Sequence, residues 1–370
     1  MSDSAEAQSR MRAYLQLVAT GPELSKSLTT AQAEDALNMI LDKQVDPVRS
    51  GIFLIALRMK RETDEENIGA LNALLNLTLQ ATAKAPEIVA IADPFNGFLR
   101  GLPASPFLPA VLAACGLPSY LHGLHAAGPK YGITPHMVLS TAGKEVDQNV
   151  DQAAAALDRD NVGWAYLDQA QYIPKLHDLV SLRDTMVKRT CISTLEVVLK
   201  PLSGSQRTHL MTGFVHKAYP PVYAALAKQA GFDSAMIIRG VEGGSIPSLS
   251  QLSRFFSYHG TEKEKMHKLA PREVGIDQRQ RMVPVPAEFE EMVLRSGFGA
   301  TEVLAPLVAR NVELGIAALN NKPGPMLDSL LYGAAIALSH TGRCEGLESG
   351  ADVARKAIAS GEAAARFNAA

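Results

Sequence analysis

Three short glycine-containing segments between residues 94 and 132 have the composition of loops that bind anions. Their sequences are Pro-Phe-Asn-Gly-Phe-Leu-Arg-Gly (94–101), Leu-His-Gly (121–123) and Gly-Pro-Lys-Tyr-Gly (128–132). Each segment follows a predicted strand and leads into a predicted helix, so that backbone N–H groups and helix N-termini surround one crevice. The sequence therefore predicts an anion-binding crevice at these loops.

Three side chains of these loops could carry chemistry. Arg100 suits a phosphate, or alternatively an ion pair with a neighbouring carboxylate. His122 follows a buried strand and either contacts a ribose or phosphate or is a hydrogen-bonded core histidine. Lys130 is predicted to contact an anion, because the flanking glycines leave the backbone open around it. The residues predicted to bind a ligand or phosphate here are Asn96, Gly97, Arg100, His122, Gly123 and Lys130.

The segment from Arg254 to Arg281 is a second candidate surface, since it contains more lysine and arginine than aspartate and glutamate. Phe255, Phe256 and Tyr258 lie beside the basic residues, and such a combination can stack bases and follow a phosphate chain. The alternative is a solvated loop whose aromatic side chains are buried. The residues predicted to contact nucleic acid in this segment are Arg272, Arg279 and Arg281.

The elements that must position these residues fall into two regions. Residues 1–84 form a predicted helical domain, because capping boxes at Thr29–Gln32 and Thr63–Glu66 each open an amphipathic pattern. From residue 85 onward, apolar runs typical of buried parallel strands alternate with helical patterns. The predicted fold class is α/β: a small all-α N-terminal domain plus a larger α/β domain (85–370) with a mainly parallel central sheet.

Within the larger region the sequence predicts the order of elements in more detail. Strands are expected at 87–92, 119–122, 195–199, 211–215 and 235–239. Residues 151–190 are rich in helix formers and are expected to leave the sheet, as candidates to join the helical domain. Residues 255–287 suggest a long loop or lid, and residues 329–367 return to amphipathic helices.

Composition narrows the class of protein. A chain of 370 residues exceeds the size at which a single core stops growing, so two domains are expected. The net charge of −2 indicates no global basic field, although a local basic face is compatible with it. Three widely spaced cysteines argue against a disulfide framework or a structural zinc site. With no apolar run long enough to span a membrane, we expect a cytoplasmic protein with no membrane partner.

Several motifs resemble anthranilate phosphoribosyltransferase, a member of glycosyltransferase family 3. Residues 28–34 and 52–63 look like its N-terminal helical domain, and Arg189-Thr190 with Lys200-Pro201-Leu202 looks like its larger domain. Similarity also covers Gly213 with His216 and the closing segment 349–361. The resemblance implies a helical domain plus an α/β domain, a homodimer through the helical domains, and a phosphoribosyl pyrophosphate donor with magnesium.

The chain departs from that family at the loops that hold the donor. Asp93-Pro-Phe-Asn-Gly97 replaces a Gly-Thr-Gly-Gly-Asp loop, and proline removes an N–H donor while phenylalanine blocks close approach. Leu121-His-Gly-Leu124 replaces Lys-His-Gly-Asn. The family's acidic pair for magnesium falls near Glu242, which makes Glu242 the one candidate metal ligand. The resemblance also matches Arg183 to the arginine that receives the acceptor's carboxylate, and Lys130 to a phosphate-contacting lysine.

The altered loops resemble a divergent branch of the family that lacks the transferase signature and is associated with nucleic-acid binding. That resemblance rests on residues 95–97, His122-Gly123 and the segment from Arg239 to Gly243, with Arg239 as a further ligand-binding candidate. The leading hypothesis is a transferase-like protein that has lost tryptophan-pathway catalysis and binds a polyanion, single-stranded or duplex nucleic acid foremost. One alternative is an active magnesium-dependent phosphoribosyltransferase with a changed acceptor, and another is a dimeric interaction protein. The sequence shows no general base and no certain cofactor.

Overall fold

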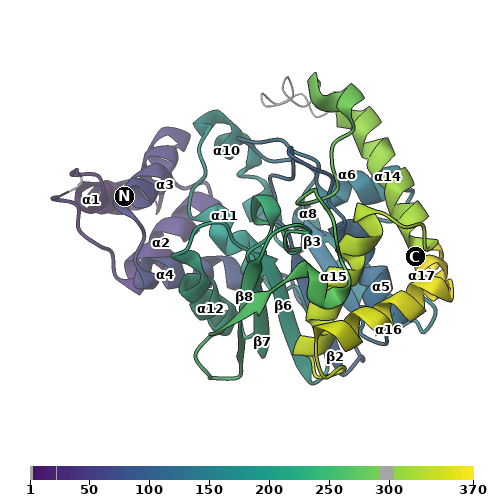
Figure 1. Cartoon of the computed structure of the whole chain (residues 1–370). Helices are drawn as coiled ribbons and strands as arrows, with labels where there is room; N and C mark the ends of the chain where they lie inside the picture. The colour runs from purple at the N-terminus through teal and green to yellow at the C-terminus, as the bar shows by residue number, and fades with distance from the viewer. Residues whose placement is uncertain (1–2, 22, 292–303) are drawn as a thin grey trace.

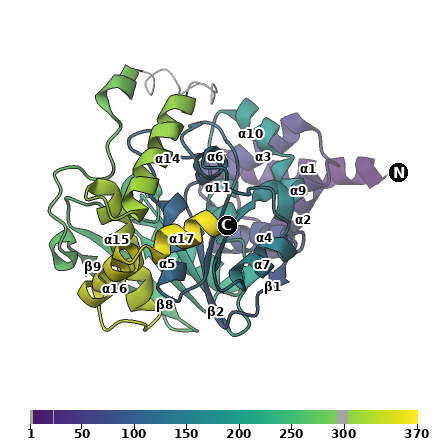
Figure 2. The same cartoon turned by 90° about the vertical axis from the view of Figure 1, so that its right-hand side faces the viewer.

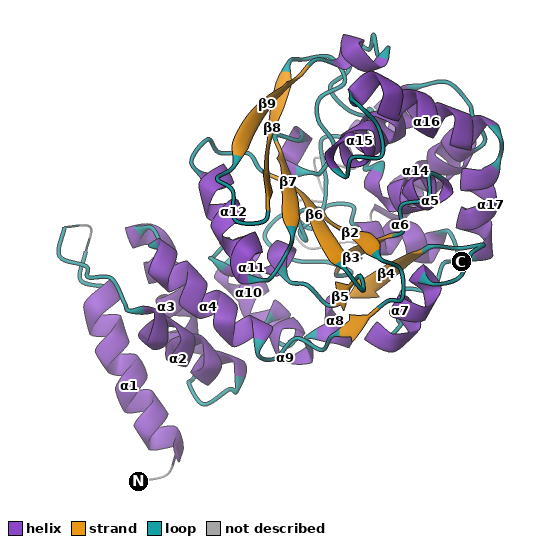
Figure 3. Ribbon diagram, turned by 90° about the horizontal axis from the view of Figure 1, so that it is seen from below, coloured by secondary structure: helices purple, strands orange, loops and turns teal. Residues whose placement is uncertain are grey.

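A small helical bundle at the N-terminus packs beside a larger α/β unit built on one central sheet (Figure 1). The computed structural model describes residues 3–21, 23–291 and 304–370. Figure 3 shows the bundle at one end of the molecule, with its first helix farthest from the sheet. The helices of the bundle are α1 (Asp3–Val18), α2 (Thr30–Leu41), α3 (Pro47–Lys60) and α4 (Asp64–Leu75).

The central sheet has seven strands in the order β4-β3-β2-β6-β7-β8-β9. Pairing is parallel from β4 to β7, whereas β8 and β9 are antiparallel additions at one edge. A separate two-stranded parallel sheet joins β1 (Ala81–Thr82) to β5 (Leu202–Ser203). The strands of the central sheet are β2 (Glu87–Ala92), β3 (Ser119–Gly123), β4 (Trp164–Asp168), β6 (Arg207–Gly213), β7 (Ser234–Ile238), β8 (Ser253–His259) and β9 (Lys265–Leu269).

Helices cover both faces of this sheet (Figures 2 and 3). One face carries α5 (Leu108–Ala114), α6 (Pro135–Thr141), α14 (Ala305–Leu319), α15 (Pro325–His340), α16 (Leu347–Ala359) and α17 (Glu362–Ala369). The other face carries α7 (Val150–Leu157), α8 (Gln169–Tyr172), α9 (Pro174–His177), α10 (Val180–Met186), α11 (Ile192–Leu195) and α12 (Tyr219–Gln229). None of the described helices is both long and apolar enough to cross a membrane.

The alternation of side chains along β2 divides the buried residues into two cores. Ile88 and Ala90 belong to the core shared with the helical bundle, while Val89 and Ile91 belong to the core under α5 and α15. Successive side chains of a strand point to opposite faces, so an uninterrupted apolar run is what a strand covered on both sides requires. The bundle therefore shares one continuous core with a face of the sheet.

Local sequence signals correctly predicted the bundle and much of the sheet. Thr29 and Thr63 are N-caps with the reciprocal hydrogen bonds of a capping box, and Asp46 caps α3 with proline at its first position. The predicted fold class of a small helical domain plus a mainly parallel α/β domain is confirmed. The predicted strands at 87–92, 119–122 and 235–239 are β2, β3 and β7 within a residue.

Three local predictions were wrong. Residues 195–199 are the end of α11 and a short 3-10 helix (Glu196–Val198), because an apolar run buried all round satisfies a helix as well as a strand. The region 151–190 contains β4, and residues 255–287 contain the rest of β8 and all of β9. Polar side chains along β9 suit an edge strand, which is why this segment resembled a loop.

Close packing of α2 on α4 gives a first prediction. A Cβ added to Gly69 would lie 2.1 Å from the carbonyl oxygen of Thr30, so Gly69→Ala forces the two helices apart. Overpacking of this kind costs about 1–3 kcal/mol, against about 1 kcal/mol gained from helix propensity. Urea unfolding should show a net loss of stability. In the control Gly51→Ala, inside α3, an added Cβ meets nothing nearer than 3.6 Å, so the midpoint should not fall below that of the wild type.

Candidate functional site

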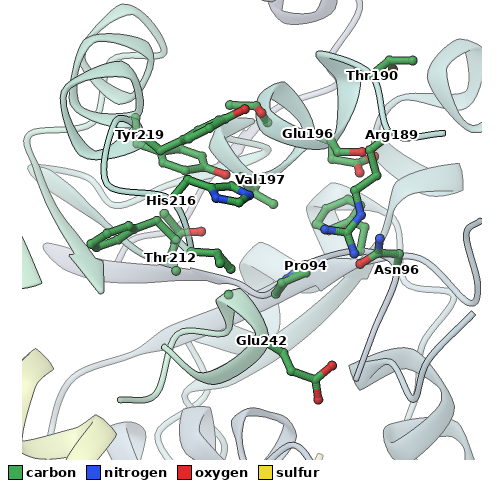
Figure 4. A pocket seen from close by; sticks show the side chains of 18 of the residues that line it. Pro94, Asn96, Arg189, Thr190, Glu196, Val197, Thr212, His216, Tyr219 and Glu242 are labelled. Atoms are coloured by element: carbon green, nitrogen blue, oxygen red, sulfur yellow. The ribbon is translucent and has the colours of Figure 1, made fainter. Parts of the chain in front are cut away.

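The main crevice lies at the carboxyl ends of β2 and β6. From β2 the chain continues to β3 and β4 on one side, and it returns to β6 on the other. This is the topological switch point at which open α/β sheets bind ligands. A cavity of about 170 Å³ opens there, lined by the loop after β2, the loop after β6 and residues before and within α11 and α12 (Figure 4).

Arg189 dominates one wall of this cavity. With its amide oxygen turned toward the guanidinium, Asn96 accepts hydrogen bonds from Nε (2.7 Å) and Nη2 (2.9 Å) of Arg189. On the opposite side His216 lies between Tyr219 and Thr212 (Figure 4). Arg58, from α3, donates a short hydrogen bond to the Tyr219 hydroxyl, so the helical bundle contributes a cation to the crevice.

Two of the three predicted loops meet at the crevice. The Gly132 N–H donates to the Asn96 carbonyl at 2.9 Å, and Phe98 and Ile133 exchange two backbone hydrogen bonds. Gly97 has φ +72°, and a Cβ there would lie 2.4 Å from the Gly132 carbonyl oxygen, so glycine is required at this position. Lys130 donates to the Gly97 carbonyl at 2.6 Å. The structure thus brings Asn96, Gly97 and Lys130 together.

Glu242 lies in the loop after β7 and is fully engaged by this pair of loops. Its carboxylate accepts the Leu99 N–H at 3.2–3.3 Å and the Arg100 N–H at 2.6 Å, and it forms a short ion pair with Lys130. Burial lowers the pKa of Lys130, and the charge of Glu242 partly offsets that effect. The Arg100 side chain itself is exposed.

The family resemblance implies magnesium at Glu242, and the residues present do not fit it. A carboxylate that already accepts two N–H groups and pairs with a lysine is a poor cation ligand, because the adjacent ammonium repels the metal. Within the described part of the chain, no group of three His, Cys, Asp or Glu side chains is placed to hold a metal ion.

The contacts of Arg183 differ from those expected of a residue that receives a ligand carboxylate, which is the role that the family resemblance implies. Its guanidinium is buried and donates to both oxygens of Glu196, with both distances 2.7 Å. Two parallel hydrogen bonds of this kind use the face of arginine that would otherwise bind a ligand carboxylate. Arg183 therefore supports the cavity wall from behind, because Glu196 lines the cavity and Arg183 neutralises it.

His122 and Gly123 lie at the end of β3, under the site. His122 is 1% exposed, its Nδ1 is 3.1 Å from the Tyr172 hydroxyl, and its ring meets Phe95 edge-on. The buried Nε2 has no partner among the described residues. Burial lowers the pKa of His122 to about 3, so the ring is neutral at physiological pH. The core interpretation of His122 fits these contacts.

Four exposed basic residues, here called the rim, follow strands at this end of the sheet or adjoin a residue that lines the cavity. Arg100 follows β2, Lys217 follows β6 and Arg239 directly follows β7, while Lys188 precedes the cavity-lining Arg189. All four side chains are exposed, and none has an acidic partner in the described ranges. Sequence reasoning did not select Arg58, Lys188 or Lys217 as ligand-binding residues, because no motif marks them. Arg58 lines the cavity only through the fold, and Lys188 and Lys217 adjoin the cavity-lining Arg189 and His216.

The basic segment 254–281 is arranged differently from its prediction. Phe255 is buried and stacks on His267 with ring centroids 4.6 Å apart, and the Tyr258 hydroxyl donates to the Phe232 carbonyl at 3.2 Å. These rings are packed into the sheet and do not form a surface for stacking bases. Arg272, Arg279 and Arg281 are exposed, with Arg272 paired to Asp277 at 3.4 Å.

Comparison with known proteins agrees with this architecture. Residues 12–78 match the helical bundle domain described for the glycosyl transferase family, and residues 104–364 match its α/β domain. The chain belongs to glycosyl transferase family 3. Among curated relatives it is 26% identical to the anthranilate phosphoribosyltransferase of Novosphingobium aromaticivorans, covering 94% of this chain and 97% of that protein. It is 25% identical to an uncharacterized protein of Aquifex aeolicus, covering 88% and 91%.

Solved structures of family members share the fold at low identity. The anthranilate phosphoribosyltransferase of Saccharomyces cerevisiae in complex with PRPP and Mg has a TM-score of 0.76 at 18% identity, over 98% of this chain and 96% of that one. The Thermus thermophilus enzyme gives 0.71 at 19% identity, over 100% and 98%. These likenesses show that both the helical bundle and the α/β unit, as far as the structure describes them, adopt the family's fold.

Burial of His122 predicts a stability loss in mild acid. Its pKa is about 3 in the folded protein and near 6.5 when exposed, so only the unfolded chain binds the proton between these values. Its contribution is fully present above pH 6.5 and is lost as the pH falls toward 3, by up to about 1.4 kcal/mol per pH unit. Urea titrations between pH 7 and 4.5 should show a shallower pH dependence in His122→Asn than in wild type. Coincident slopes would contradict this assignment.

Proposed function

We propose that this protein binds a polyanion, nucleic acid foremost, across the crevice at the switch point. One observation carries the proposal: every carboxylate that lines the cavity is neutralised from within, while the cations of the rim remain exposed. Glu196 is paired with Arg183, and Glu242 with Lys130. The resulting positive field is local and is compatible with the overall charge of −2.

The cavity also offers surfaces for bases. The rings of His216 and Tyr219 have centroids 6.0 Å apart, and those of Tyr219 and Tyr223 are 5.9 Å apart, along one side of the cavity. Base stacking on aromatic rings combined with binding of phosphates by arginine is the mode by which proteins hold single strands. We therefore favour a single-stranded ligand, with bases toward His216 and Tyr219 and phosphates along the basic rim.

The second candidate is an active magnesium-dependent phosphoribosyltransferase with an altered acceptor. Family membership and the cavity's place at the switch point favour it. Against it stand Pro94 and Phe95 in the loop after β2, and the ion pair that occupies Glu242. Release of pyrophosphate from PRPP in the presence of magnesium and candidate acceptors would establish this activity.

The binding proposal predicts a salt-dependent interaction that the basic residues of the crevice control. Fluorescence anisotropy with labelled single-stranded DNA, RNA and duplex DNA should give a Kd that rises steeply with salt. The double variant Arg189→Ala with Lys217→Ala should weaken binding about tenfold or more. It should also reduce the salt slope by roughly one for each phosphate that the variant no longer neutralises.

Matched controls separate the crevice from other basic surfaces. Lys322→Ala removes an exposed charge after α14 and should leave the Kd unchanged. The double variant Arg272→Ala with Arg279→Ala tests the basic segment 254–281. If binding weakens in that variant alone, the nucleic acid binds to that segment and not to the crevice. An unchanged Kd in Arg189→Ala with Lys217→Ala would place the ligand outside the crevice. No binding of any nucleic acid at low salt would overturn the proposal.

We further infer a homodimer through the helical bundle. An apolar groove between α3 and α10 is lined by Ile55, Leu182 and Met186, and it leaves Val48 69% and Ile52 46% exposed. A second copy of this face would bury these side chains and duplicate the basic crevice, which raises avidity for a long polyanion.

The dimer makes a separate prediction. Val48→Asp with Ile52→Asp should convert the protein to a monomer in sedimentation or light-scattering measurements, because two carboxylates per subunit would be buried unpaired. Leu252→Asp, at an apolar side chain 81% exposed elsewhere on the surface, should leave the mass unchanged. A wild-type protein that is monomeric at tens of micromolar would refute the inference.

A further inference from the structure

The contacts of Glu242 are those that a bound phosphate would make. Two consecutive backbone N–H groups, of Leu99 and Arg100, converge on its carboxylate, together with the Lys130 ammonium. Consecutive N–H groups with a nearby lysine form the usual protein cradle for an oxyanion. Here the oxyanion is supplied by the chain itself.

The backbone around Glu242 is shaped to deliver this side chain. Glu242 has φ +56° and ψ 13°, a left-handed conformation that costs a non-glycine residue energy. The loop is pressed against the end of β6: a Cβ at Gly213 would lie 2.0 Å from the Gly244 carbonyl oxygen, and one at Gly240 would lie 1.7 Å from it. The strained conformation persists because the ion pair and the two N–H bonds hold the side chain in place.

Three cations act on this position. Lys130 contacts the carboxylate directly and is held by its bond to the Gly97 carbonyl. Burial lowers the pKa of Lys130, and the positive charges of Arg189 and Arg100 lower it further. Glu242 is the one acidic side chain that contacts Lys130 in the described residues, so its removal would leave a concentration of positive charge and two unpaired N–H donors.

We propose that Glu242 is the resident anion of a phosphate-binding site formed by the Leu99 and Arg100 N–H groups and Lys130, and that it excludes external phosphate and diphosphate from that site. The inference concerns the same crevice as the proposed function but does not depend on nucleic acid being its ligand. It makes Glu242 a specificity residue: small diphosphate ligands are rejected, while a longer polyanion is held by the exposed rim. A tethered carboxylate wins this competition because its effective concentration is far above that of a solute.

Removing the resident carboxylate should open the site. Glu242→Ala deletes the side chain. Glu242→Gly also deletes it and relieves the left-handed strain, so it serves as the second variant if Glu242→Ala does not fold. Isothermal titration with inorganic pyrophosphate, without magnesium, should detect binding at least tenfold tighter in both variants than in wild type. Added phosphate should also raise the Tm of the variants and leave that of the wild type nearly unchanged.

Two further variants make the result specific. Glu242→Ala with Lys130→Ala should lose the new pyrophosphate binding, because the site then lacks its ammonium. Glu262→Ala removes an exposed carboxylate paired with Lys265 and should bind no more pyrophosphate than wild type. Folded Glu242 variants that bind no pyrophosphate, or a wild type that binds it equally well, would overturn the inference.

The same proteins distinguish this inference from the proposed function. Nucleic-acid binding by wild type with no gain of pyrophosphate binding in the variants would refute only the role of Glu242. Gain of pyrophosphate binding with no nucleic-acid affinity in wild type would refute only the polyanion proposal. A magnesium titration of the wild type serves as a third arm, since tight magnesium binding that disappears in Glu242→Ala would show that the carboxylate is a metal ligand instead.

Discussion

The site depends on the parallel pairing of β2 with β6. Six residues of each strand are in register, and the Thr212 hydroxyl donates to the Ala92 carbonyl at 2.8 Å where both strands end. Because the chain leaves these neighbouring strands in opposite directions, their following loops separate and cannot cover the gap between them. The walls of the crevice are positioned by this one junction: the loop with Asn96 follows β2, and the loop with His216 follows β6.

Charge around this junction is set by pairing inside the protein. Buried carboxylates need a partner, and here the partners are Arg183 for Glu196 and Lys130 for Glu242. Asp93 accepts hydrogen bonds from Ser105 and from the Ser245 N–H, and burial raises its pKa. Internal pairing removes the negative charge from the cavity and leaves the exposed arginines and lysines to set its potential.

Sequence alone predicted the parts of the fold that local signals encode. Capping boxes marked the helices of the bundle, and the two-sided apolar run at 87–92 marked a central strand. Edge strand β9 was missed because its exposed polar residues lack that signal. The glycine loops found in the sequence lie at the carboxyl ends of β2 and β3, because the backbone conformations that favour glycine leave a trace in the sequence. The sequence carries no sign that Arg183 pairs with Glu196, thirteen positions away, or that Lys130 pairs with Glu242. These charged residue types usually lie on the surface, and only the tertiary fold decides that they are buried here.

The replaced donor loop and the position of Glu242 are physically linked. Pro94 removes an N–H donor from the start of the loop, and Phe95 packs its ring inward against His122. The N–H groups of Leu99 and Arg100 follow in the same loop, and their hydrogen-bond acceptor is the Glu242 carboxylate. In a loop that bound magnesium-diphosphate the ligand would be that acceptor. Here the acceptor is the carboxylate of Glu242, a residue with a strained backbone conformation. The same carboxylate neutralises Lys130, which would otherwise attract a ligand phosphate. The departures from the family pattern at 93–97 and at 242 thus meet in one place, where the loop after β2 and Lys130 bind the Glu242 carboxylate.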